Sequence, residues 1–154
     1  MTVKELMTKK VGTCAREADL SAAVKVMSQC NCGFVPVLDT QGTAVGVLTD
    51  RDVCRAVATT SRPLSHIAVS EVMSHPVFAC SPDENLETVL VTMAKHQVRR
   101  LPVLDKTGRL QGVLSIDDIV LAPRRRGSPT SEDIMIIDAL KAICRPRPVE
   151  IVMS

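Results

Sequence analysis

An internal repeat constrains this chain more than any other feature of its sequence. The stretch GVLTDRDV at Gly46–Val53 returns as GVLSIDDI at Gly112–Ile119, so the two copies are offset by 66 residues. The same offset joins matching residues from Val3 to Ile119 without an insertion. Because a unit of about 60 residues buries little surface by itself, the repeat predicts two similar units that pack about a pseudo-twofold axis.

Each unit has the pattern of a strand, a helix, two strands and a second helix. Asp19 precedes apolar residues at helical spacing in the first unit, and Asn85 does the same in the second, which predicts an N-cap at each position. A Pro-Val-Leu-Asp strand and turn follows in both units, and then a strand that ends in the motif Gly-x-x-Thr/Ser-x-x-Asp. The pattern predicts an α+β fold with repeats at residues 1–60 and 61–122. The first strand of each unit is expected at Val11–Cys14 and Val77–Cys80.

Residues 123–154 have no counterpart in the repeat. They begin with a basic linker that contains Arg124–Arg126, and a pattern typical of a helix follows from a cap at Thr130 or Ser131 to about Cys144. We expect this C-terminal helix to pack on the module or on a neighbouring subunit. A run of three arginines is usually a solvated linker, and a nucleic-acid contact is the minority interpretation. The apolar face expected for the helix carries Ile134, Ile137, Leu140 and Cys144.

The composition excludes several classes of function. Two phenylalanines are the only aromatic residues among Phe, Tyr and Trp, which argues against a base-stacking platform for single strands. The net charge of +2 is too small to indicate nucleic-acid binding by itself. No apolar run reaches the roughly 20 residues of a membrane span, and the first residues lack the apolar core of a signal peptide. We therefore expect a cytoplasmic chain without a membrane segment.

Neither the cysteines nor the histidines form a catalytic or metal-binding pattern. The sequence Cys30-Asn31-Cys32 is not a Cys-x-x-Cys knuckle, and no second pair has zinc spacing, so the six cysteines are interpreted as structural thiols. No histidine stands in a motif with a nucleophile, and no two carboxylates are arranged for acid–base work. We therefore expect no enzyme activity, no catalytic residue, no metal and no required cofactor. The three histidines are His66, His75 and His96.

A hydroxyl and a carboxylate stand three residues apart in both copies of the repeated motif. Thr49 with Asp52, and Ser115 with Asp118, can cap the helix that follows and place a carboxylate in its first turn. The same pair can also hold adjacent sugar hydroxyls while the open end of the helix faces an anion. One copy alone favours the cap, and two copies in register shift the balance toward ligand binding.

With these two motifs, each present twice, the chain resembles a tandem pair of cystathionine-β-synthase (CBS) domains, often called a Bateman module. The resemblance covers about residues 1–122. It implies two small α+β units with two clefts between them, and it implies homodimers of such modules. It also implies adenosine ligands in the clefts, such as AMP, ADP, ATP, NAD or S-adenosylmethionine.

The resemblance also implies which residues touch the ligand. Thr49 and Asp52 would hold a ribose in the first cleft, and Ser115 and Asp118 would do so in the second. Thr13 matches a family Thr that approaches the adenine edge, whereas Ala79 at the equivalent place offers only its backbone. Arg99 or Arg100 would also reach a phosphate. The residues that lead into the Pro strands would line the base pockets, with Gly33, Phe34 and Val35 in one cleft and Arg99, Arg100 and Leu101 in the other.

Two classes of function remain open at this point. The first is a regulatory module that binds an adenosine nucleotide and signals to an unknown protein partner. The second is a ligand-free dimerisation scaffold, or a nucleic-acid adaptor that uses Arg124–Arg126. A titration with adenosine nucleotides separates the two classes.

Overall fold

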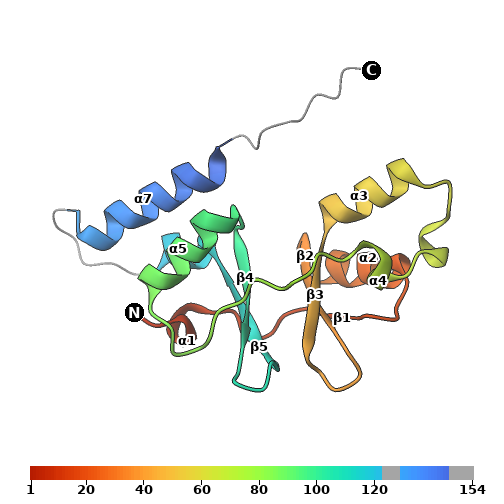
Figure 1. Ribbon diagram of the computed structural model, residues 1–154, viewed down its shortest axis with the longest axis horizontal. Helices are drawn as coiled ribbons and strands as arrows, with labels where there is room; N and C mark the ends of the chain where they lie inside the picture. Colours follow the sequence, from red (N-terminus) through yellow and green to blue (C-terminus); the bar gives the residue numbers. More distant parts are fainter. Residues whose placement is uncertain (123–128, 146–154) are drawn as a thin grey trace.

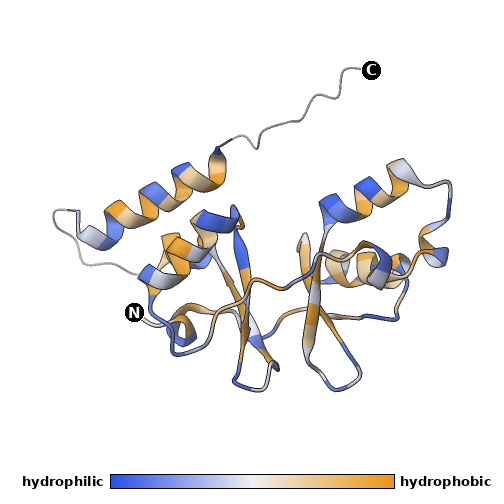
Figure 2. Cartoon of the chain, viewed as in Figure 1, coloured by the Kyte–Doolittle hydropathy of each residue, from blue (hydrophilic) through white to orange (hydrophobic). Residues whose placement is uncertain are grey.

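The computed structural model of the chain describes residues 1–122 and 129–145. Two α+β units stand side by side with their small sheets toward each other, and a C-terminal helix lies over the second unit (Figure 1). Apolar residues dominate the strands, and polar residues gather at the hairpin ends (Figure 2). The α+β class expected from the sequence is confirmed. The Arg124–Arg126 run lies outside the described residues.

Both units are built on one antiparallel strand pair with the same register. Pro36 faces Val47 in the first unit, and Pro102 faces Val113 in the second, so the pairing follows the offset of 66. The first unit contains β1 (Cys14–Ala15), α2 (Leu20–Gln29), β2 (Phe34–Leu38), β3 (Ala44–Thr49) and α3 (Asp50–Thr59). The second contains α5 (Leu86–His96), β4 (Arg100–Leu104), β5 (Leu110–Ser115) and α6 (Ile116–Leu121).

The first strand of each unit is shorter than the sequence predicts. In the first unit, only Cys14 and Ala15 form a strand, which runs parallel to β2. In the second unit, Cys80 forms a single parallel bridge with Val103. The predicted strands at Val11–Cys14 and Val77–Cys80 are therefore wrong in extent, because the chain reaches the sheet only at the last residue of each pattern.

Local sequence signals set the ends of the two core helices. Asp19 accepts a hydrogen bond from the backbone N–H of Ala22 at 2.9 Å, and Asn85 accepts one from Thr88 at 3.0 Å. Both predicted N-caps are confirmed, and each satisfies a backbone donor that has no partner within its helix. The two helices bury their apolar faces in separate cores.

The short helices α1 (Val3–Leu6) and α4 (Val69–Val72) each lead into one repeat and pack on the other. Val3 is buried in the core of the second unit, and Val69 is buried in the core of the first. Figure 1 shows α1 beside β5, and α4 beside α2. Each core is therefore completed by a segment from the other repeat, and the two units cannot separate without opening both cores.

The C-terminal helix is present, but it buries a different face from the predicted one. Helix α7 (Ser131–Cys144) begins at a Thr130 cap and packs on α5, as expected of a helix that covers the module. Ile134 and Ile137 are 55% and 50% exposed, so the predicted stripe is wrong. The helix has apolar residues on more than one side, and spacing alone does not select the buried one. The residues it buries are Ile136, Ala139 and Ile143, with Leu140 partly buried beside them.

Helices α3 and α6 each bury one apolar residue and expose another. Val53 and Ile119 are buried, whereas Val57 and Val120 are exposed. A homodimer that covers the exposed pair stays a prediction. No helix in the described ranges is long and apolar enough to cross a membrane.

Candidate functional site

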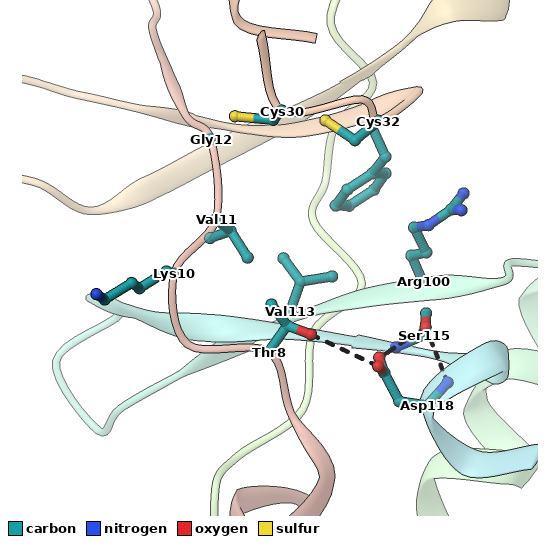
Figure 3. A pocket seen from close by; sticks show the side chains of 11 residues that line it. Thr8, Lys10, Val11, Gly12, Cys30, Cys32, Arg100, Val113, Ser115 and Asp118 are labelled. Carbon is teal, nitrogen blue, oxygen red and sulfur yellow. Dashed lines mark hydrogen bonds between the residues drawn. The ribbon is translucent and has the colours of Figure 1, made fainter. Parts of the chain in front are cut away.

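A cavity of about 190 Å³ lies between the two units (Figure 3). It lies where the segment after α1 leaves the second sheet and crosses to the first unit; before the crossing, Thr8 and Val113 exchange backbone hydrogen bonds of 2.9 and 3.0 Å. Ligand sites commonly measure about 300–1,000 Å³, so a nucleotide-sized molecule would extend from this cavity into the open cleft. The lining residues are Thr8, Lys10, Val11, Gly12, Cys30, Cys32 and Phe34 from the first repeat and Arg100, Val113, Ser115 and Asp118 from the second.

The Asp118 carboxylate is held in the cavity by the start of α6. Its Oδ2 atom accepts hydrogen bonds from the backbone N–H of Ser115 at 2.7 Å and from the Ser115 hydroxyl at 2.6 Å. Its Oδ1 atom accepts only a long contact of 3.5 Å from the Thr8 hydroxyl, as far as the described residues show. A carboxylate can accept about four hydrogen bonds, so Oδ1 retains the capacity to accept a donor from a ligand.

Thr49 and Asp52 repeat this geometry at the start of α3. Asp52 Oδ2 accepts from the Thr49 N–H at 2.9 Å and from the Thr49 hydroxyl at 2.7 Å. Both motifs are therefore capping boxes, which confirms the structural role considered for them. Asp52 borders a different hollow of about 350 Å³ between α3 and α4, whose wall includes an Arg62–Glu71 ion pair at 2.8 Å.

The residues expected to contact a ligand fall into three groups. Phe34, Arg100, Ser115 and Asp118 line the cavity together, although Phe34 belongs to the first repeat and the others to the second. Val35 and Leu101 are fully buried in the two cores, so their side chains cannot line a cleft, which corrects the expectation for them. The remaining expected residues lie outside the cavity lining, and they are Thr13, Gly33, Thr49, Asp52, Ala79 and Arg99.

Gly33 has a local structural role. A Cβ atom at this position would lie 2.5 Å from Asp50 Oδ2, and the Gly33 carbonyl accepts a hydrogen bond from the Asp50 N–H at 3.1 Å. Glycine therefore lets the chain before β2 approach the first turn of α3.

Sequence reasoning missed the lining residues that reach the cavity through the crossing segment. Lys10, Val11 and Gly12 carry no local signal of a site, because their position depends on where the segment after α1 pairs. Cys30 and Cys32 were interpreted as structural thiols, yet both line the cavity. The interpretation fits Cys14 and Cys80, whose burial raises the pKa of the thiol to about 11 and about 12, so both stay protonated at neutral pH.

Apolar and charged groups share the cavity wall. Val11, Phe34 and Val113 supply apolar surface, while Lys10 and Arg100 supply positive charge. Arg100 lies 3.9 Å from Asp117, an exposed and therefore weak ion pair that leaves its guanidinium accessible. Within the described ranges, no three His, Cys, Asp or Glu residues come together as metal ligands. The wall suits a molecule with an apolar ring, hydroxyl donors and an anionic group.

Comparison with known proteins gives consistent matches. The family model of the CBS domain matches residues 3–59 and 69–125. The CBS domain-containing protein YhcV of Bacillus subtilis is 36% identical over 120 residues, which are 78% of this chain and 84% of YhcV. The homoserine O-acetyltransferase of Methanohalophilus mahii is 33% identical over 119 residues, but they make up only 24% of that enzyme.

A solved structure has the same architecture. The crystal structure of the CBS domain pair of protein MJ0100, in complex with 5′-methylthioadenosine and S-adenosyl-L-methionine, superposes with a TM-score of 0.69 at 26% identity. The superposition covers 78% of this chain and 93% of that one.

Proposed function

Because this chain belongs to the CBS-domain family and carries two CBS domains, we propose that it is a regulatory module that binds an adenosine ligand between its repeats and signals to a protein partner. The single observation that carries the proposal is the Asp118 carboxylate, which is fixed through Oδ2 and directs a second oxygen into the cavity. The binding site that we propose consists of Ser115, Asp118 and the residues around them in the cavity.

The ribose would bind at Asp118. Adjacent 2′ and 3′ hydroxyls both donate hydrogen bonds, and a carboxylate accepts them in the charge-assisted form, which is stronger than a neutral hydrogen bond. Ser115 holds Asp118 in place before a ligand arrives, so the ligand does not have to order this side chain. Thr8, whose hydroxyl contacts Oδ1 at 3.5 Å, would give way to a ribose hydroxyl.

The base would contact the apolar part of the cavity wall, and the anionic group would contact its positively charged part. Val11 and Phe34 offer apolar contact for the flat base, and Thr13, directly after the lining segment, would read its edge. Lys10 and Arg100 would attract a phosphate or carboxylate. The adenosine class is supported by the MJ0100 pair, whose two ligands both contain adenosine.

A ligand in this position would contact both repeats at once. Val11 and Phe34 belong to the first repeat, and Asp118 belongs to the second. Such a ligand stabilises the arrangement of the units that it fits best, by an amount set by its differential affinity. The match to the acetyltransferase covers about a quarter of that enzyme, so we propose regulation rather than catalysis.

Calorimetric titration with AMP, ATP, NAD, S-adenosylmethionine and 5′-methylthioadenosine tests the proposal. We expect Asp118→Ala to lose about 1.5–3 kcal/mol of binding free energy, which is about ten- to hundredfold in affinity. Since this change also removes a helix cap, Asp133→Ala is the matched control, because it removes the same kind of cap from α7, away from the cavity. The 2′-deoxy form of the ligand tests the diol.

Two results would refute this function. One is the absence of binding below millimolar concentration for every adenosine compound, and the other is an Asp118→Ala variant with unchanged affinity. In either case, the ligand-free dimerisation scaffold becomes the better interpretation of the fold.

A further inference from the structure

The pseudo-twofold relation places a second cleft opposite the cavity. Thr8 bridges to Val113, and the residue 66 positions later, Ser74, bridges to Val47 through hydrogen bonds of 2.8 and 3.1 Å. The segment after α4 therefore pairs with the first sheet as the segment after α1 pairs with the second. We call the cavity the Asp118 cleft, and the equivalent place beside Thr49 and Asp52 the Asp52 cleft, which is distinct from the hollow between α3 and α4.

Two lining positions differ sharply in size between the clefts. Gly12 and Cys30 line the Asp118 cleft, and the offset of 66 puts Phe78 and His96 at the same positions of the Asp52 cleft. The rings of Phe78 and His96 stack with their centroids 3.7 Å apart and their planes 19° apart. One cleft thus has a glycine and a small thiol where the other has two stacked rings.

The close approach of these two positions is a shared property of the repeats. A Cβ atom at position 12 would lie only 2.7 Å from Cys30 Sγ, so the backbone of Gly12 already touches the end of α2. In the second repeat, the same approach is made by two ring faces, which stack favourably. Position 12 therefore adds no side chain to the Asp118 cleft, whereas position 78 adds an aromatic ring that stacks on His96 and is 40% exposed.

From this pairing we infer that the Phe78–His96 stack closes the Asp52 cleft, so that each chain binds one adenosine ligand, beside Asp118. The inference rests on the proposed function and adds which cleft works and which residues decide it. Charge supports the same choice, since Lys10 lines the Asp118 cleft and Pro76 takes the equivalent position in the other. Lys10 therefore gives an anionic ligand group a cation at the Asp118 cleft that the repeat does not reproduce at position 76.

Native mass spectrometry with excess AMP and with excess 5′-methylthioadenosine measures the number of ligands per chain. We expect one in the wild type. The variant Phe78→Gly/His96→Cys copies the first cleft into the second, and we expect it to bind two. Adding Asp52→Ala to that variant is expected to return the number to one. Phe78→Leu, which keeps apolar bulk, is the matched control and is expected to stay at one.

A second measurement does not depend on how the variants fold. Cys30 is exposed and lines the Asp118 cleft, whereas Cys144 is exposed on α7. We expect saturating ligand to slow alkylation of Cys30 by iodoacetamide at least tenfold and to leave Cys144 unchanged, with both sites quantified by peptide mass mapping.

The outcomes separate this inference from the function on which it rests. Two ligands per wild-type chain would overturn the inference and keep the function, because the Phe78 ring, which is 40% exposed, would then serve as a stacking surface for a base. Binding without protection of Cys30 would place the ligand elsewhere and also overturn it. A folded Phe78→Gly/His96→Cys variant that still binds one ligand would refute the closing role of the stack. Failure of the wild type to bind any adenosine compound would instead remove the proposed function.

Discussion

The first and second repeats share their strand register and helix caps, but their helices α2 and α5 have different surroundings. Helix α5 packs under α7, and the core of the second unit includes Ile136, Ala139 and Ile143 from that helix. In the first unit, α2 is instead contacted by the short 3-10 helix η1 (Leu64–His66), which has three residues where α7 has 14. The repeat thus sets the strand register and helix caps that both units share. Elements outside the repeat, and single differences between the two copies, make the units differ in stability and in the shape of their clefts.

Shortening a buried side chain of α7 is expected to have the largest effect. Ile136→Ala removes apolar atoms from the second core, and we expect it to cost about 2–4 kcal/mol of unfolding free energy, as for other large-to-small core changes. Ile137→Ala is the matched control, because Ile137 is the next residue of the helix and is exposed, so its loss should stay within about 0.5 kcal/mol. Urea denaturation measures both variants.

Amide hydrogen exchange shows which unit loses stability in the Ile136→Ala variant. We expect Ile136→Ala to lower protection in α5 more than in α2. Equal loss in the two helices would mean that the units open together, through the crossed helices α1 and α4, and the contrast between the units would disappear.

The two crossing segments are expected to tolerate an added methyl group differently. A Cβ atom at Gly112 would lie 2.5 Å from the Thr8 carbonyl oxygen, whereas one at Gly46 would lie 2.5 Å from Met73 Sδ. Backbone held by two bridging hydrogen bonds cannot move aside, but a methionine side chain adapts easily. We expect Gly112→Ala to cost about 1–3 kcal/mol, and Gly46→Ala to cost less. Thermal unfolding compares the pair, and a larger loss for Gly46→Ala would contradict this account.

The features that the sequence predicted well are those that local chemistry decides. Asp19 and Asn85 were recognisable as caps because a short oxygen side chain satisfies the first N–H groups of a helix wherever the helix packs. The capping boxes of Thr49 and Ser115 follow from the same rule. The repeat itself predicted two matching units, because apolar residues at the same spacing in both copies are buried on the same sides of their helices and strands.

The features that the sequence did not predict depend on long-range packing. The position of Lys10 and Gly12 at the cavity depends on the pairing of Thr8 with Val113, more than 100 residues away. The side chains of Val35 and Leu101 were expected at the clefts, but alternation along β2 and β4 points them into the cores. Which side of α7 is buried is likewise decided by its packing against α5.

The smallest expected effect concerns two equivalent carboxylates, Glu5 and Glu71. Hydrogen bonds from Thr2 lower the pKa of Glu5, whereas the Arg62 guanidinium, together with the Ala68 N–H, lowers the pKa of Glu71 to about 2. Because each folded pKa lies below the ordinary value of 4.5, each carboxylate stabilises the fold at neutral pH. That contribution is lost as the pH falls through 4.5 toward the folded pKa, which for Glu71 is about 2.

Replacing Arg62 separates the two carboxylates. We expect Arg62→Gln to raise the pKa of Glu71 toward 4.5, because its first cause is removed, and to leave the pKa of Glu5 unchanged. Arg62 and Glu71 are both exposed, so we expect only a small change in the free energy of unfolding, and the titration is the sharper readout. A pH titration of the side-chain carboxyl ¹³C signals by NMR follows the two residues in one sample. An unchanged Glu71 titration in Arg62→Gln would show that the N–H groups at the start of α4 hold this carboxylate by themselves, and the two repeats would then be alike at this position.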